Sequence, residues 1–303
     1  MFRNLQQVLR WRAPNAFKRS AQEHASSFDY AELASHCRTQ NEFNRLHIEL
    51  ENVLTPLELA DIAGQADIGA HPRPTHAWIE KIRKWTPQLF DTPQRYRRQK
   101  VSEHVILYQD PERPMRDKGL LLAFSGNARR LMVPVSVFLQ FVDSCSWDVV
   151  VLRKDQRNSY LSGLGASADF PGLVEYVQAA VGTKAYQRVI TLGTSAGGFF
   201  AAWAAVLMDA YRGISAGGGL PSTLPSLVQA DKSLIRTRPA TPREADLCFI
   251  YGRDHDRDHR SALLLLDLFG GRLLPIPDVQ VHGVLGALLK RCELAAFMNE
   301  MLA

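Results

Sequence analysis

Gly193-Thr194-Ser195-Ala196-Gly197 is the stretch that decides the fold of this chain, because of the residues on either side of it. The apolar, β-branched run 188–192 before it predicts a strand, and the apolar run 198–208 after it predicts a helix. The serine then occupies the sharp turn that joins the two elements. Glycine is needed two residues before and after such a serine, because larger side chains would collide there. Ser195 is therefore the candidate nucleophile.

The same five-residue pattern occurs again as Gly213-Ile214-Ser215-Ala216-Gly217, so the pattern alone is not sufficient. Residues 218–222, which follow the second copy, read Gly-Gly-Leu-Pro-Ser and cannot begin a helix. Without a following helix, no exposed turn raises the hydroxyl and no helix N-terminus lies beneath it. We interpret Ser215 as an ordinary strand or loop serine.

Composition is typical of a globular protein: 303 residues, 46% of them hydrophobic, with a net charge of +5. The first 100 residues hold 15 basic and 11 acidic side chains, an excess too small and too scattered to favour nucleic-acid binding. Four widely separated cysteines favour a reducing compartment. No run reaches the length of a membrane-spanning helix, and none near the N-terminus is typical of a secretory signal, so a cytoplasmic protein is expected.

Residues 1–98 are expected to form a helical N-terminal region whose role the sequence does not reveal. The acid-free, amphipathic segment 1–12 predicts a surface helix, although an organelle presequence shows the same pattern. Thr55-Pro56-Leu57-Glu58 predicts a helix start with a capping box, and Gly64 predicts the end of that helix. Beyond a break at 71–75, a further amphipathic helix is expected over 77–85.

From residue 102 to residue 303 strands and helices alternate, which predicts an α/β domain. The predicted fold class is α/β: a mostly parallel sheet with helices on both faces, plus the helical N-terminal extension. The expected strands are 105–108, 120–124, 147–152, 188–192, 212–215, 247–251 and 272–276. The first two flank a turn at 110–114 and are expected to pair antiparallel. One C-terminal helix is expected over 285–301.

With these elements in this order, the chain resembles the α/β-hydrolase superfamily over residues 102–303, in which serine, acid and histidine follow one another along the chain. The resemblance implies that His282, in the loop after the last strand, is the general base. It also implies an acid just past strand 247–251, where three aspartates compete. Asp256 best matches the usual offset from the preceding glycine and is preferred, whereas Asp258 is a possible helix cap and Asp254 a possible solvated side chain.

The resemblance also indicates an oxyanion hole after strand 120–124, where Ser125 replaces the histidine of the histidine-glycine motif that many such enzymes carry. The backbone N–H groups of Asn127 and Ala196 would bind the oxyanion there. Arg129 and Arg130 follow, and they either attract an acidic substrate group or are merely solvated.

About thirty residues separate strands 212–215 and 247–251, a common place for a cap over the site. Its apolar side chains would line an acyl pocket or belong to the core; they are Leu220, Leu224, Leu227 and Val228. His255 and His259 stand four residues apart, a spacing that metal sites use, but no further ligand motif accompanies them. Neither a metal nor a cofactor is expected.

These residues together predict a serine hydrolase that cleaves an ester or related acyl bond of a small-molecule substrate through an acyl-serine intermediate. Esterase, thioesterase, peptidase and acyltransferase share this machinery, and the sequence does not separate them. The alternative is a non-enzymatic scaffold of the same fold, whose N-terminal helices bind a partner. A metal-dependent hydrolase built on segment 254–259 is a third possibility. The oligomeric state is not indicated.

Overall fold

A computed structural model describes residues 30–303, apart from 68, 70, 128, 155–159, 166 and 222–244. The surface helix expected over 1–12 and most of the expected cap, including Leu224, Leu227 and Val228, lie outside the described residues. Within the described part of the chain, no helix combines the length and the apolar character that crossing a membrane requires.

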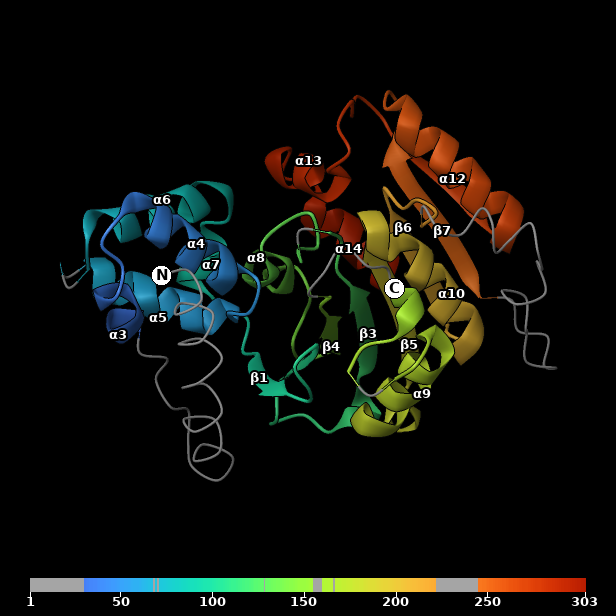
Figure 1. Ribbon diagram of the computed structural model, residues 1–303, viewed down its shortest axis with the longest axis horizontal. Coiled ribbons are helices and arrows are strands. Elements are labelled where there is room, and N and C mark those ends of the chain that lie inside the picture. The colour runs from blue at the N-terminus through green and yellow to red at the C-terminus, as the bar shows by residue number, and fades with distance from the viewer. Residues whose placement is uncertain are drawn as a thin grey trace.

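The described chain contains one sheet of eight strands in the order β1-β2-β4-β3-β5-β6-β7-β8. Figure 1 shows the sheet with helices around it. The strands are β1 (Arg97–Lys100), β2 (Val105–Gln109), β3 (Gly119–Phe124), β4 (Trp147–Leu152), β5 (Arg188–Thr194), β6 (Arg212–Ala216), β7 (Asp246–Gly252) and β8 (Arg272–Ile276). Six neighbouring strands of this sheet run parallel to one another: β4, β3, β5, β6, β7 and β8. Strand β2 is antiparallel to both of its neighbours, β1 and β4. The predicted fold class is confirmed.

The expected antiparallel pairing of the first two predicted strands is wrong. β3 does not pair with β2; it lies between β4 and β5 and is parallel to both. All six residues of β3 are buried, so this strand belongs in the middle of the sheet, whereas β2 takes the place beside the edge strand β1. The sequence of β1, Arg-Arg-Gln-Lys, gave no strand signal, because an edge strand is stabilised by backbone pairing and not by apolar side chains.

Two hydrophobic cores lie on the two faces of the sheet, because successive side chains of a strand point to opposite faces. Leu120, Leu122 and Phe124 of β3 pack with side chains from α9 (Phe170–Val181), α10 (Gly198–Met208) and α12 (Asp256–Phe269). Leu121 and Ala123 point the other way, toward side chains from α8 (Val135–Gln140), α13 (Val284–Lys290) and α14 (Leu294–Leu302). Helices therefore cover both faces.

The N-terminal helices pack into the second of these cores and lie together beside α8 and β1 (Figure 1). They are α3 (Tyr30–Ser35), α4 (Gln40–Glu51), α5 (Pro56–Asp67), α6 (Arg73–Trp85) and α7 (Gln88–Asp91). The predicted capping box is confirmed: Thr55 N–H donates to Glu58 Oε2 at 2.9 Å, and Glu58 N–H donates to Thr55 Oγ1 at 3.1 Å.

Three helix boundaries differ from the expectation. α5 continues through Gly64 to Asp67, because packing of its apolar face outweighs the low helix propensity of one glycine. α6 begins at Arg73, four residues before the expected start. The expected C-terminal helix is divided into α13 and α14 at Cys292, whose φ of 60° cannot continue a helix.

Candidate active site

Ser195 lies on the turn between β5 and α10 with a φ of 52°, a left-handed conformation that is strained for a residue with a side chain. The flanking glycines allow the chain to make this turn. A Cβ on Gly193 would lie 2.1 Å from the carbonyl oxygen of Gly197, and a Cβ on Gly197 would lie 2.3 Å from that of Phe124. The turn therefore has the geometry of a nucleophile elbow.

His282 contacts Ser195 from the loop between β8 and α13, with its Nε2 2.8 Å from the Ser195 Oγ. Its Nδ1 lies 2.9 Å from both carboxylate oxygens of Asp258. When the Nδ1–H donates to the carboxylate, Nε2 is the unprotonated nitrogen and can accept the serine proton. Three residues far apart in the sequence thus form one continuous chain of hydrogen bonds that ends at the elbow.

Asp258 contacts His282, and the sequence-based preference for Asp256 is corrected here. α12 begins at Asp256, which is exposed on the first turn, and Asp254 is exposed in the turn before it. Asp258 lies two residues after Asp256, which corresponds to a rotation of about 200° around the helix axis. Its side chain therefore points to the opposite side of α12 from Asp256 and is only 3% exposed. Counting residues from the preceding glycine failed because the count does not say where the helix begins.

Two more residues border the Asp258 carboxylate, and the sequence reasoning missed both roles. His255 caps α12: its Nδ1 lies 3.3 Å from the Asp258 backbone nitrogen and 3.2 Å from the Asp258 Oδ1. Gly217 has a φ of 55°, and a Cβ there would lie 3.1 Å from the Asp258 Oδ2. The last glycine of the second motif therefore makes room for the carboxylate. The sequence signal for this role was that Gly217 directly follows β6, the strand that lies between β5 and β7 in the sheet.

Ser215 lies inside β6 and is 1% exposed, which confirms its interpretation as a strand serine. Its Oγ has no hydrogen-bond partner among the described residues. A Cβ on Gly198 would lie 2.4 Å from this oxygen, so the hydroxyl is packed tightly against the start of α10.

The loop after β3 passes directly beside Ser195, since a Cβ on Gly126 would lie 3.1 Å from the Ser195 Cβ. Gly126 N–H donates to the Arg130 carbonyl oxygen at 3.1 Å, and Arg129 N–H donates to the Gly126 carbonyl oxygen at 3.0 Å. The next main-chain amide belongs to Asn127. The amide of Ala196 lies in the first turn of the helical run that starts at Ser195, where N–H groups have no intrahelical partner.

Ser125, at the position where the resembled family often has histidine, is fully buried and anchors this loop. Its Oγ lies 3.3 Å from the hydroxyl oxygen of Tyr160, which lies 3.1 Å from the Ser125 carbonyl oxygen and 2.9 Å from that of Leu152. Burial raises the pKa of Tyr160, so its hydroxyl remains a proton donor. The sequence did not indicate this role for Tyr160.

Arg129 and Arg130 contact carboxylates of α4, an arrangement that neither sequence-based alternative included. Arg130 Nη2 lies 2.5 Å from Glu51 Oε2, and Arg129 Nη1 lies 3.7 Å from Glu49 Oε1. Each of the two guanidinium groups therefore pairs with a carboxylate of the same chain. The structure gives no support to recruitment of an acidic substrate by this pair.

The two histidines of segment 254–259 have separate surroundings. His259 stacks on Tyr251, with ring centroids 4.9 Å apart, while His255 lies beside Asp258. In the described part of the chain, no three His, Cys, Asp or Glu side chains are grouped so that they could hold a metal ion.

A mostly parallel sheet covered on both faces carries Ser195 on an elbow after one strand, with an aspartate and a histidine after later strands. A parallel sheet with a serine on a strand-turn-helix elbow, followed along the chain by this aspartate and this histidine, is typical of one fold. The chain has the α/β-hydrolase fold.

Comparison with known proteins gave matches among solved structures, whereas no protein-family model and no curated protein matches the chain. A dienelactone hydrolase from Anabaena variabilis ATCC 29413 is 16% identical with a TM-score of 0.43, over 69% of this chain and 100% of that one. Est1E from Butyrivibrio proteoclasticus is 10% identical with a TM-score of 0.43, over 69% and 99%. Poly(aspartic acid) hydrolase-1 from Sphingomonas sp. KT-1 is 15% identical with a TM-score of 0.44, over 65% and 98%.

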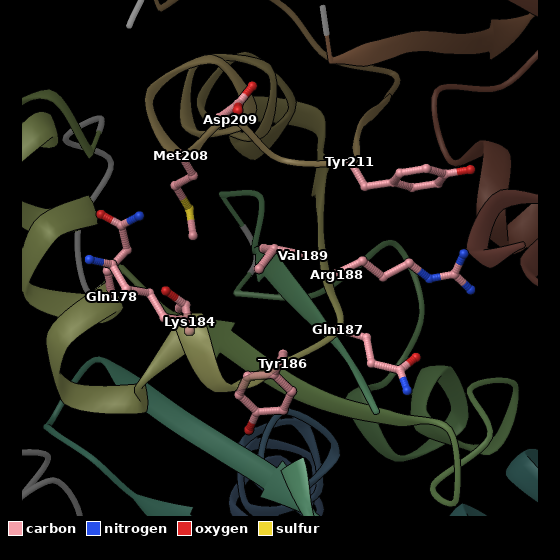
Figure 2. Close-up of a pocket in the computed structure, with 10 residues that line it drawn as sticks. Gln178, Lys184, Tyr186, Gln187, Arg188, Val189, Met208, Asp209 and Tyr211 are labelled. Atoms are coloured by element: carbon pink, nitrogen blue, oxygen red, sulfur yellow. The ribbon is translucent and has the colours of Figure 1, made fainter. Parts of the chain in front are cut away.

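A hollow of about 650 Å³ opens at the amino end of β5, and Figure 2 shows the residues that line it. It is lined by the end of α9, the start of β5 and the end of α10, including Gln178, Arg188 and Asp209. The Arg188 guanidinium donates hydrogen bonds to the carbonyl oxygens of Leu302 and Ala303 at the end of α14. Because Ser195 follows the carboxyl end of β5, this hollow is not part of the candidate active site.

Proposed function

We propose that this chain is a serine hydrolase that cleaves an ester or related acyl bond of a small molecule through a covalent acyl-Ser195 intermediate. The observation that carries the proposal is the 2.8 Å contact between the His282 Nε2 and the Oγ of a serine held on an elbow turn. A serine hydroxyl is a poor nucleophile at neutral pH unless a base accepts its proton as it attacks.

In the proposed acylation, the Ser195 Oγ attacks the acyl carbon while its proton passes to the His282 Nε2. Asp258 holds the imidazole in the required tautomer and stabilises its positive charge, since the His282 Nδ1 lies 2.9 Å from both carboxylate oxygens. The oxygen of the tetrahedral intermediate receives hydrogen bonds from the amides of Asn127 and Ala196. The intermediate collapses as His282 protonates the leaving group, and the acyl group remains on Ser195.

In the proposed deacylation, His282 takes a proton from water, and the resulting hydroxide attacks the acyl carbon. His282 then returns a proton to the Ser195 Oγ as the carboxylic acid departs, which restores the starting state. Because His282 has about half of its side chain exposed, water can reach the acyl group beside it. Hydrolysis is therefore proposed in preference to transfer of the acyl group to another acceptor.

Labelling with a fluorophosphonate probe tests the proposal, because such probes phosphonylate an activated serine. The wild type and Ser215→Ala should label, and Ser195→Ala should not, with peptide mapping placing the adduct on Ser195. Hydrolysis of p-nitrophenyl acetate should fall at least about a thousandfold in Ser195→Ala. A wild type that neither labels nor hydrolyses esters, thioesters or peptides would instead support the scaffold alternative.

A further inference from the structure

A buried carboxylate at the end of α4 links the N-terminal helices to the loop beside Ser195. Glu51 is 6% exposed, and its Oε1 accepts a hydrogen bond from the Trp78 Nε1 at 3.0 Å. Its Oε2 contacts the Arg130 Nη2. A buried carboxylate is costly unless it is paired and hydrogen-bonded, so this contact fixes the position of Arg130 relative to the helices.

Arg130 in turn connects two segments that surround the nucleophile. Its carbonyl oxygen accepts the Gly126 N–H at 3.1 Å and the Thr194 Oγ1 hydroxyl at 3.1 Å. Gly126 precedes Asn127, whose amide is a proposed oxyanion donor, and Thr194 immediately precedes Ser195. A shift of Arg130 would therefore change the distance between the proposed donor and the nucleophile.

A second, weaker connection runs from the same helix. The Glu49 carboxylate lies 3.7 Å from both the Arg129 Nη1 and the Arg153 Nη2. Arg129 is in the same loop, and Arg153 follows β4 directly. The exposed fraction of the Glu49 side chain is 42%, so solvent screens these contacts more than it screens the Glu51 contact.

We propose that Glu51 and Arg130 are positioning residues for the hydrolysis proposed above: the N-terminal helices hold loop 126–130 so that the Asn127 amide faces the oxyanion. The inference rests on the proposed function and gives residues 30–91 a role in it. Oxyanion donors act because they are fixed before the reaction, and a misplacement of about 1 Å far from the chemistry can cost about a hundredfold in rate.

The test compares Glu51→Gln, Arg130→Gln and the double variant in hydrolysis of p-nitrophenyl acetate. Glutamine at position 51 keeps an acceptor for Trp78 but removes the charge that holds Arg130. Each single variant should lose about tenfold in kcat with KM changed less than about twofold, and the double variant should lose no more, because both substitutions break one contact. Glu80→Gln is the control: its ion pair with Arg83 lies within α6 and the Glu80 side chain is exposed, so its kcat should equal that of the wild type.

Amide hydrogen exchange, measured in a Ser195→Ala background, provides a readout that does not depend on activity. In Glu51→Gln the Gly126 amide should exchange faster, while exchange in the central strands β3 and β5 stays unchanged. Unchanged kcat and exchange in Glu51→Gln, additive losses in the double variant, or faster exchange throughout the chain would each overturn the inference. Absence of fluorophosphonate labelling in the wild type would be a failure of the proposed function, whereas the exchange of Gly126 would still decide whether Glu51 holds the loop.

Discussion

Asp258 and His282 are joined through both carboxylate oxygens, each 2.9 Å from the His282 Nδ1, although 24 residues separate them in the sequence. Asp258 is almost fully buried on α12, whereas about half of the His282 side chain is exposed. The carboxylate thus forms the fixed end of the pair and sets the orientation of the ring.

Substitution of the three aspartates tests this assignment of the acid. Asp258→Asn should lower kcat by about four orders of magnitude, because an amide in place of the carboxylate stabilises the wrong imidazole tautomer. Asp254→Asn and Asp256→Asn serve as matched controls and should retain kcat within about twofold, since both side chains are exposed. Ester hydrolysis is the measurement, and a larger loss in Asp256→Asn than in Asp258→Asn would contradict the assignment.

The elbow should not tolerate a methyl group at Gly197. In Gly197→Ala the new Cβ would lie 2.3 Å from the Phe124 carbonyl oxygen, so we expect a loss of about 3 kcal/mol in the free energy of unfolding. Gly64→Ala is the control within helix α5, where no atom beyond the adjacent residues and the helix's own backbone lies within 4 Å of the added Cβ. It should gain about 0.5–1 kcal/mol, because alanine is the better helix former. Urea unfolding measures both, and equal effects would contradict the packing argument.

Ser215→Ala should be neutral or stabilising. The Ser215 hydroxyl is buried without a hydrogen-bond partner among the described residues, so its removal relieves a desolvation cost worth up to about 1 kcal/mol. Thermal unfolding at matched protein concentration should give an equal or higher midpoint, and ester hydrolysis should be unchanged. A loss of activity comparable to that in Ser195→Ala would show that the two glycine motifs had been assigned the wrong way round.

Stability should decrease in mild acid because of His47. Burial lowers the pKa of His47 from 6.5 to about 4, so between these values the unfolded chain binds a proton that the folded chain does not. The contribution of neutral His47 to the free energy of unfolding is therefore present above pH 6.5 and is lost as the pH falls toward 4. Between pH 7 and pH 5 the loss should be about 2 kcal/mol.

Urea unfolding of His47→Gln at pH 7 and pH 5 measures this contribution. Glutamine can still accept a hydrogen bond from the Tyr30 hydroxyl, which lies 2.8 Å from the His47 Nε2, but it does not titrate. The variant should lose less stability on acidification than the wild type. His36→Gln, at an exposed histidine, should behave like the wild type. An equal acid loss in His47→Gln would remove His47 as the cause.

The sequence was sufficient to predict the seven strands from β2 to β8, each to within two residues at either end, because apolar β-branched runs mark buried strands. It did not predict their order. In the sheet, β4 lies next to β2 and β3 lies next to β5, which is the reverse of their order in the sequence. Which strand takes the inner position depends on burial of both its faces and not on the local sequence pattern. The edge strand β1, made of charged and polar residues, carried no signal at all.

For the candidate site, the elbow and His282 were accessible from sequence because a strand, a turn and a helix each leave a local pattern. The aspartate that contacts His282 was not accessible, since the choice between Asp256 and Asp258 depends on where α12 begins and hence on which side of the helix each faces. Glu51 and Tyr160 were equally hidden, because their contacts join segments 79 and 35 residues apart.

The contact between the N-terminal helices and the sheet also determines how the chain can be divided. The Tyr108 hydroxyl of β2 donates to the Val53 carbonyl oxygen at 2.9 Å, and Arg98 of β1 pairs with Glu58 of α5 at 2.8 Å. A protein shortened to residues 102–303 would lack β1 and would expose the apolar side chains of α8 that now pack against α5. Such a fragment should aggregate, and the intact chain should melt in one cooperative transition with no separately folded half.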